Sequence, residues 1–139
     1  PFLRYRNPGV HIAPINIMRS SLPMLREFGL GLARAADRLG RPVLLVASTD
    51  MTHFEPEKAA RERDHLVIDK ILALDEKGMW DTVQRHHISM CGHDPVAAGI
   101  AYAKARGAAS AELVAYQTSA DSGIAGPEEV VGYAGIILR

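Results

Sequence analysis

A carboxylate, an imidazole and a thiol stand on two short segments of this sequence. Asp50 and His53 lie in the segment STDMTHF (residues 48–54), and Cys91 lies in SMCGHDP (residues 89–95). These three groups are the ligand types of soft-to-borderline transition metals. Cys91 is the only cysteine, so it cannot form a disulfide within the chain. We therefore take Asp50, His53 and Cys91 as candidate metal ligands and catalytic residues.

Each of these residues also has an ordinary structural role open to it. Asp50 could form a turn or cap the following helix, and His53 could be a surface residue; the D-x-x-H spacing alone slightly favours these roles. Cys91 precedes a predicted helix, whose N-terminal amides and dipole favour a thiolate. Most free cysteines, however, are small buried hydrophobic residues. The metal interpretation therefore depends on the three side chains meeting.

Other polar residues are weaker candidates. His93 could be a second ligand or a base beside Cys91, but a loop histidine is more often solvated. His86 and His87 are adjacent, and adjacent residues on a helix diverge, so the two cannot readily bind one ion. We interpret both as structural or surface residues, and His11 and His65 as structural residues. Three residues near the end of a predicted strand could line the same crevice as Asp50 or simply form a polar loop: Tyr116, Ser119 and Asp121.

The elements expected to position the candidates begin with a strand, a helix and a second strand. Residues 10–17 and 43–47 are apolar runs that predict strands. Residues 22–39 carry apolar side chains at a helical period, with Ser21 as N-cap and Gly40 at the end. These lengths predict a βαβ unit with parallel strands. Asp50 and His53 would follow its second strand, where ligands bind in open α/β sheets.

The second half of the chain predicts three helices and two strands. A helical pattern with apolar residues from 66 to 74 is closed by Gly78, and a short helix follows over 79–87. Asp94 and Pro95 are typical of a helix start, here for a helix reaching about residue 106. Residues 112–118 and 130–138 predict strands, joined by a loop over 119–127. We expect one α/β domain over residues 1–139, with a mostly parallel sheet flanked by helices.

Composition excludes several classes of protein. The 16 basic residues equal the 16 acidic ones, which gives no electrostatic footprint for nucleic acid or an anionic membrane. No apolar stretch approaches the roughly 20 residues that span a bilayer. One cysteine fits a reducing, cytoplasmic compartment. The apolar start PFLRY is typical of the interior of a larger domain, and a processed or artificial end is the alternative.

Four motifs occur in an order that resembles a known family. They are S-x-D-x-x-H, C-G-x-x-P, Y-x-x-S-x-D and V-G-Y-A, preceded by an opening P-F-L-x-Y. Together they resemble the C-terminal half of the Memo family, whose prokaryotic members are called AmmeMemoRadiSam system protein B. The resemblance implies a fold similar to class III extradiol dioxygenases, which use non-haem iron. It also implies a pocket of histidines, an aspartate and a cysteine, associated with iron and copper.

The resemblance places the family's Asp, His and Cys on Asp50, His53 and Cys91. The other pocket histidines belong to an N-terminal half that this chain lacks, so we expect the missing half or another chain as partner, and weak metal binding by this chain alone. We expect a metal-dependent protein with redox, dioxygenase-like or hydrolytic chemistry, and the sequence leaves open whether it is an enzyme. One alternative is a module with a vestigial pocket that binds a peptide, a small molecule or a protein. Another is a thiol activity with Cys91 as nucleophile and His53 or His93 as base.

Overall fold

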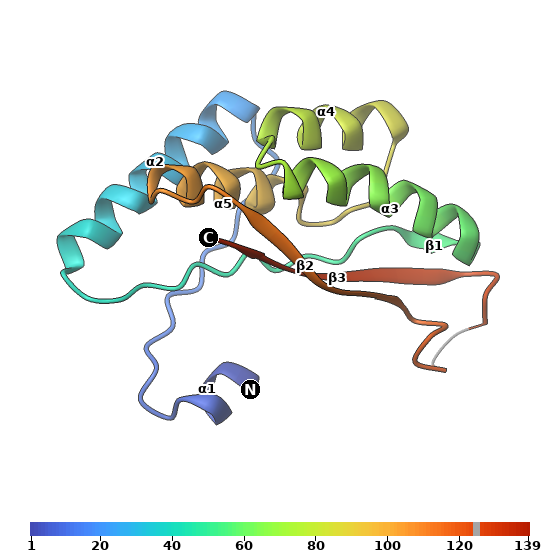
Figure 1. Ribbon diagram of the computed structural model, residues 1–139, viewed down its shortest axis with the longest axis horizontal. Coiled ribbons are helices and arrows are strands. Elements are labelled where there is room, and N and C mark those ends of the chain that lie inside the picture. The colour runs from blue at the N-terminus through green and yellow to red at the C-terminus, as the bar shows by residue number, and fades with distance from the viewer. Residues whose placement is uncertain (124–125) are drawn as a thin grey trace.

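In the computed structural model, residues 1–123 and 126–139 are described. The longer helices lie on one side of a small sheet, and the short N-terminal helix lies on the other (Figure 1). Residues 124 and 125, in the predicted 119–127 loop, lie outside the described residues. The helices are α1 (Phe2–Arg6), α2 (Leu22–Leu39), α3 (Glu57–Leu72), α4 (Glu76–His86) and α5 (His93–Ala105). The strands are β1 (His53–Glu55), β2 (Ala111–Thr118) and β3 (Val130–Leu138).

The sheet is antiparallel throughout, so the expected mostly parallel sheet is wrong. Its strand order is β1-β3-β2, with Glu55 opposite Val130 and Tyr116 opposite Ala134. β2 and β3 are antiparallel because a loop joins them, whereas parallel neighbours need a crossover connection such as a helix. The two long strands therefore form a hairpin, at the positions that the sequence predicts.

The predicted strands over 10–17 and 43–47 are also wrong, and with them the βαβ unit. A strand needs a neighbour for its backbone hydrogen bonds. In the part of the chain that the structure describes, no backbone bond joins residues 43–47 to another strand. Leu44 is 81% exposed and Val46 is 60% exposed, whereas Leu45 and Ala47 pack against α5. The apolar run thus packs on one side only.

The helices lie close to their predicted positions. α2 matches residues 22–39, and Gly40 follows it with φ of +60°. α3 ends before Gly78, which instead lies inside α4, where its N–H donates to the carboxylate of the N-cap Asp75 at 2.8 Å. Across the described ranges, no helix combines the length and apolar character needed to cross a membrane.

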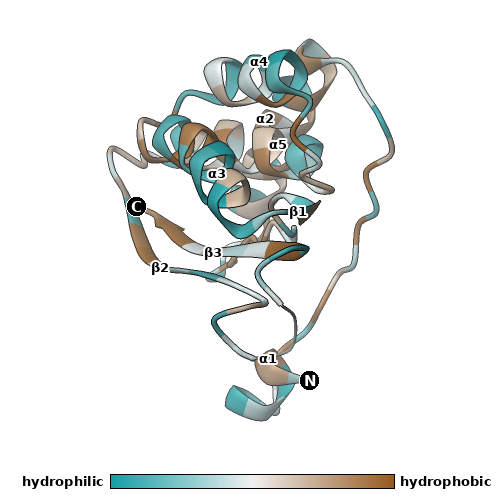
Figure 2. Cartoon of the chain, turned by 90° about the vertical axis from the view of Figure 1, so that its right-hand side faces the viewer, coloured by the Kyte–Doolittle hydropathy of each residue, from teal (hydrophilic) through white to brown (hydrophobic). Residues whose placement is uncertain are grey.

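The core lies between the helices and the sheet and holds both candidate segments. Met51 and Met90, next to Asp50 and Cys91 in sequence, are each 2% exposed and belong to one apolar cluster. α2 packs tightly on α5 because Gly29 leaves room for the Ala98 carbonyl. Figure 2 shows the segment between α1 and α2 running outside this body, with apolar residues along it. Buried methionines therefore fix the backbone on which the polar candidates stand.

Candidate metal centre

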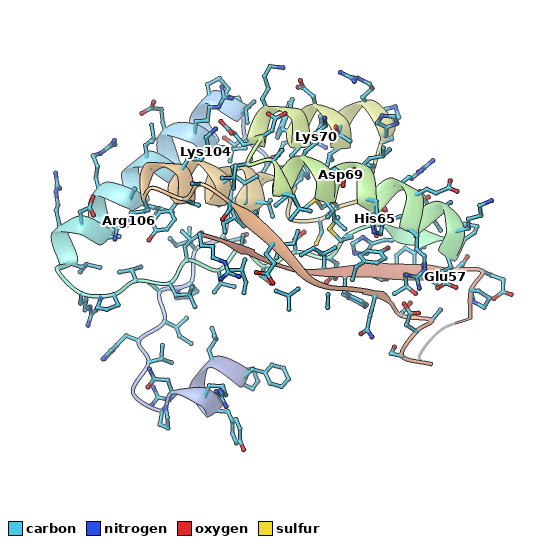
Figure 3. All side chains as sticks on the ribbon, viewed as in Figure 1. Glu57, His65, Asp69, Lys70, Lys104 and Arg106 are labelled. Atoms are coloured by element: carbon cyan, nitrogen blue, oxygen red, sulfur yellow. The ribbon has the colours of Figure 1, made fainter. Side chains whose placement is uncertain are left out.

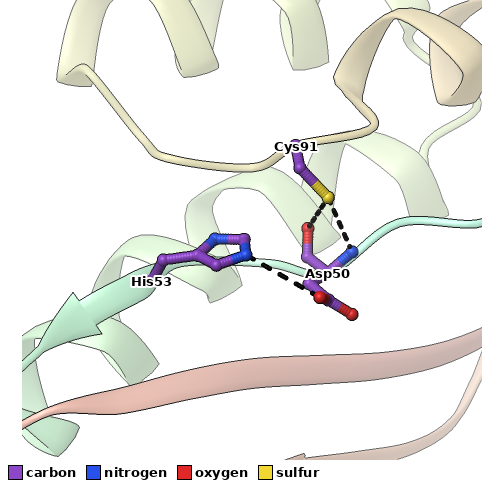
Figure 4. A group of neighbouring side chains, drawn as sticks. All are labelled: Asp50, His53 and Cys91. Atoms are coloured by element: carbon purple, nitrogen blue, oxygen red, sulfur yellow. Dashed lines mark hydrogen bonds and ion pairs between the residues drawn. The ribbon is translucent and has the colours of Figure 1, made fainter.

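The three candidate ligands meet although Cys91 is distant from the others in sequence. One ligand atom of each residue, Asp50, His53 and Cys91, lies within 4.8 Å of the other two (Figure 4). Asp50 and His53 come from the segment that enters β1, and Cys91 from the loop between α4 and α5. This convergence is what the sequence predicts.

A glycine allows the two segments to approach. The N–H of Gly92 donates to Thr49 Oγ1 at 2.8 Å, and that hydroxyl donates to the Asp50 carbonyl, also at 2.8 Å. A Cβ at position 92 would lie 2.5 Å from the Thr49 Cβ and 2.8 Å from the Ser48 carbonyl oxygen. Any side chain there would push the segments apart. Gly92 therefore sets the spacing between Cys91 and Asp50.

The sulfur of Cys91 accepts a backbone hydrogen bond. The N–H of Asp50 donates to Sγ at 3.2 Å, and Thr49 Oγ1 lies 3.8 Å from it. Cys91 is exposed and stands just before the first turn of α5. The Asp50 N–H therefore points at the sulfur atom that would bind a metal. The thiolate is the form that binds metals.

Ser89 fixes the tautomer of His53. The ring Nδ1 lies 2.8 Å from the Ser89 carbonyl oxygen, which can only accept, so Nδ1 carries the proton. The backbone N–H of His53 also donates to Ser89 Oγ at 2.7 Å. Nε2 then keeps its lone pair, and it lies 3.7 Å from Asp50 Oδ2. Metal-binding histidines are commonly held in this way.

The donor set fits a first-row transition ion. Bonds from such ions to nitrogen, sulfur and oxygen are about 2.0–2.3 Å long. Atoms within 4.8 Å of one another can share one ion after small side-chain rotations. Three protein ligands leave at least one coordination position open. Asp50, His53 and Cys91 could therefore hold an ion that also binds a further ligand.

A buried carboxylate supports the segment from below. Asp64 on α3 is fully buried and accepts the Thr52 N–H at 2.9 Å and the Tyr116 hydroxyl at 2.8 Å. A Cβ on Gly132 would collide with this carboxylate. Burial, then the hydrogen bond to Asp64 and its charge, raise the pKa of Tyr116 well above its usual value, so the phenol stays a neutral donor. Because Thr52 lies between Asp50 and His53, Asp64 holds both ligands.

The predicted crevice residues at the end of β2 lie away from the three ligands. Tyr116 reaches Asp64 instead, and the Ser119 hydroxyl accepts the Val131 N–H at 3.0 Å. Asp121 pairs with Arg61 at 2.6 Å. Hydrogen bonds from the Thr118 backbone N–H and from Arg61 lower the pKa of the Asp121 carboxyl. These residues brace β2 against α3.

The other histidines also lie outside the group. His65 on α3 packs edge-on against the Tyr116 ring, with centroids 4.9 Å apart (Figure 3). His93 donates from Nδ1 to the Met90 carbonyl at 3.0 Å, and its Nε2 lies 3.2 Å from Asp94. Three further histidines are exposed, His86 and His87 at the end of α4 and His11 in the segment before α2.

The predicted helix start, with Asp94 as N-cap and Pro95 as the first helical residue, is wrong by two residues. α5 begins at His93 with Gly92 as N-cap, and the Asp94 carboxylate turns to other partners. It is buried and accepts the Ser20 N–H at 3.0 Å and the Trp80 indole N–H at 3.3 Å. Asp94 therefore joins α5 to α4 and to the segment before α2.

Sequence reasoning missed the residues that support the ligands. Ser89 and Thr49 act mainly through backbone contacts, which leave no signal in residue spacing. Asp64 lies within a helical pattern, where an acidic residue usually faces solvent. Gly92 did carry a signal, since a glycine directly after the only cysteine indicates a close backbone approach.

Comparison with known proteins identifies the family. The family described as Memo-like protein matches residues 1–137. A MEMO1 family protein of Methanopyrus kandleri is 42% identical over 141 residues, covering 100% of this chain and 49% of the relative. One of Archaeoglobus fulgidus is 40% identical over 139 residues, covering 100% and 52%. The chain spans about half the length of the curated relatives it matches. The chain belongs to the Memo-like protein family.

Proposed function

We propose that Asp50, His53 and Cys91 bind an iron or copper ion in a Memo-like protein with redox or dioxygenase-like activity. The observation that carries the proposal is the approach of three different ligand atoms to within 4.8 Å. The Ser89 carbonyl supports it further, because it leaves Nε2 of His53 free to bind. A carboxylate, an imidazole and a thiolate suit these metals better than they suit magnesium or calcium.

The residues have separate roles in this proposal. Cys91 binds as a thiolate that the Asp50 N–H stabilises, and His53 binds through neutral Nε2. Asp50 offers an oxygen ligand whose side chain is 48% exposed, so it can release the ion or exchange with another ligand. Iron or copper would supply electron-transfer chemistry. The open coordination positions would take the substrate.

We propose that a further half completes the site and covers the apolar groove beside it. The groove has a volume of about 570 Å³ and lies between residues 43–47, α5 and β3. Its lining includes Thr49 and Met51, which flank Asp50, and Met90, which precedes Cys91. The curated relatives are about twice as long as this chain. Additional histidine ligands from such a half would strengthen the metal site.

A thiol-based activity is the second candidate. It is favoured by the approach of His53 to Cys91, since Nε2 is available as a base and the Asp50 N–H donates to Sγ at 3.2 Å. Alkylation of Cys91 by iodoacetamide, with and without a chelator, separates the two candidates. Protection by metal that the chelator removes supports the metal site. Equal and rapid alkylation in both conditions supports the thiol activity.

Metal titration of the purified chain tests the proposal directly. We expect one equivalent of Fe(II), Cu(I) or Zn(II) to bind weakly under anaerobic conditions, and binding to be lost in Cys91→Ser and in His53→Ala. His86→Ala is the control, because this exposed histidine lies outside the group. Binding that Cys91→Ser leaves unchanged would contradict the proposal. Tight stoichiometric binding, lost in Cys91→Ser, would show that the second half is dispensable.

A further inference from the structure

Phe54, directly after His53, has a backbone conformation that aromatic residues rarely adopt. Its φ angle is +57°, in the left-handed region that favours glycine. For a bulky residue this is a true outlier. It also stands where the β1–β3 register shifts, between His53 and Glu55. The strain therefore lies next to a candidate ligand, as strain at functional sites often does.

The register shift accounts for the left-handed backbone at Phe54 but not for an aromatic residue in a position that favours glycine. The Phe54 side chain is 73% exposed, so core burial does not offset the strain. The two other non-glycine residues described with positive φ both have structural reasons for it. Leu74 packs against the core cluster, and His87 ends α4 in the left-handed conformation typical of a C-cap. Phe54 instead places its ring 5.8 Å from the His53 ring, at 59° to it.

We propose that Phe54 is a specificity-determining residue whose ring forms an apolar wall at the rim of the candidate metal centre. Aromatic groups attract one another at ring separations of about 4.5–7 Å. A ligand bound to the metal beside His53 would bring its own substituent within this range of Phe54. The class of ligand selected is one that binds metal through oxygen and carries an aromatic ring. This inference rests on the proposed metal site.

Two chelators that differ only in their substituent provide the test. Benzohydroxamate and acetohydroxamate bind metal through the same two oxygens, but one carries a phenyl ring and the other a methyl group. The full chain is loaded with Co(II), whose thiolate absorption band reports only metal bound to Cys91. The preference is the ratio of the affinity for benzohydroxamate to the affinity for acetohydroxamate. We expect this ratio to be about threefold to tenfold higher for the loaded chain than for aqueous Co(II), as one aromatic contact predicts.

Substitutions at Phe54 test whether its ring causes that preference. Phe54→Gly should reduce it to the value for aqueous Co(II), and Phe54→Trp should retain it. His87→Gly is the matched control, since it relieves positive φ at an exposed position on α4 and should retain the preference. The unfolding midpoint of Phe54→Gly should not fall, because the ring is exposed and glycine accepts the backbone angle.

Each outcome has a distinct meaning. A preference unchanged in Phe54→Gly, or absent in the wild-type chain that shows the thiolate band, overturns the role of Phe54 and leaves the metal site intact. A large fall in the unfolding midpoint of Phe54→Gly would make Phe54 a packing residue and also overturn it. A wild-type chain without a thiolate band contradicts the proposed metal site, and the inference falls with it.

Discussion

At the scale of single residues, the candidate centre depends on neighbours that fix each ligand. The Ser89 carbonyl decides which nitrogen of His53 carries the proton, and the Asp50 N–H donates to the Cys91 sulfur. Gly92 brings the two segments together. None of these contacts uses the carboxylate oxygens of Asp50, so they form whether or not its side chain is buried. The precision of the group comes from the backbone.

Gly92→Ala tests the spacing of the two segments. The new Cβ would lie 2.5 Å from the Thr49 Cβ and 2.8 Å from the Ser48 carbonyl, so the backbone must shift. We expect a loss of about 1–3 kcal/mol in unfolding free energy, as in overpacked cores, together with weaker metal binding. Urea unfolding and metal titration measure the two effects.

Gly99→Ala is the control for that change. A Cβ at this position on α5 would meet Ala47 and Leu45 at an ordinary 3.5 Å, and alanine favours the helix. We expect its stability and metal affinity to match or exceed those of the wild type. Equal behaviour of the two alanine variants would show that the close approach at Gly92 is unimportant.

At the scale of elements, buried carboxylates tie the helices to one another and to the sheet, and two act in this way besides Asp94. Asp64 joins α3 to the ligand segment and to β2. Glu76 on α4 is 7% exposed and accepts Arg26 Nε of α2 at 2.9 Å and Lys104 Nζ of α5 at 3.0 Å. Figure 3 marks Lys104 on α5. Both carboxylates thus act between elements rather than within them.

Asp64→Ala should destabilise the fold and weaken metal binding together. The change leaves the Thr52 N–H and the Tyr116 hydroxyl without their acceptor in a buried site. We expect a loss of roughly 2–5 kcal/mol, since each unsatisfied buried group costs about 1–3 kcal/mol. Tyr116→Phe removes only the second hydrogen bond and should cost less and leave metal affinity unchanged. Urea unfolding that ranks Tyr116→Phe as the more damaging variant would refute this role of Asp64.

The stability of the chain should depend on Glu76 at acidic pH. Burial by itself raises the pKa of Glu76, but the hydrogen bond from Lys104, the backbone and the charges of Lys104 and Arg26 outweigh it and lower that pKa below its usual value. A carboxyl with a lowered pKa stabilises the fold above its unfolded pKa of about 4.3 and loses this contribution as pH falls through the folded value.

Unfolding by urea between pH 6.5 and 3 measures this dependence. Stability should fall below about pH 5, and Glu76→Gln should flatten part of that fall. Asp69→Asn, which changes an exposed carboxylate on α3, is the control and should leave the profile nearly unchanged. An identical profile in Glu76→Gln and the wild type would contradict the linkage.

The elements also show where sequence reasoning succeeds and where it stops. Helical periodicity placed α2, and the hairpin strands followed from short apolar runs around a polar loop. Residues 43–47 have the composition of a buried strand, but pairing needs a neighbouring strand, which composition cannot supply. The ligands could be predicted by chemical type. Their convergence depends on Gly92 and on the buried Met51 and Met90, which act through packing.

At the scale of the whole molecule, α2 to α5 lie on one side of the sheet, and the opposite face of β2 and β3 carries none of them (Figure 1). Exposed apolar side chains on β2 and β3 include Val114, Tyr133 and Ile137. Residues 43–47 add Leu44 and Val46 beside the groove of about 570 Å³. An apolar surface of this kind is typical of an interface. It belongs to the region where we propose that a further half packs.

We therefore expect the 139-residue chain alone to associate. Sedimentation velocity should give a mass above 15.1 kDa that rises with concentration. Val46→Lys should shift the chain toward monomer, whereas Met24→Lys, at an exposed position on α2, should not. A compact monomer at every concentration would show that this surface does not bind another chain.

X-ray absorption of the copper- or zinc-loaded chain tests the central claim most directly, because it identifies the ligand atoms. We expect one sulfur at about 2.3 Å from the metal, together with nitrogen or oxygen at about 2.0–2.2 Å. The sulfur should disappear in Cys91→Ser, and the imidazole scattering should disappear in His53→Ala. A wild-type spectrum with only nitrogen and oxygen ligands, unchanged by either substitution, would contradict the assignment of Asp50, His53 and Cys91 as a metal centre.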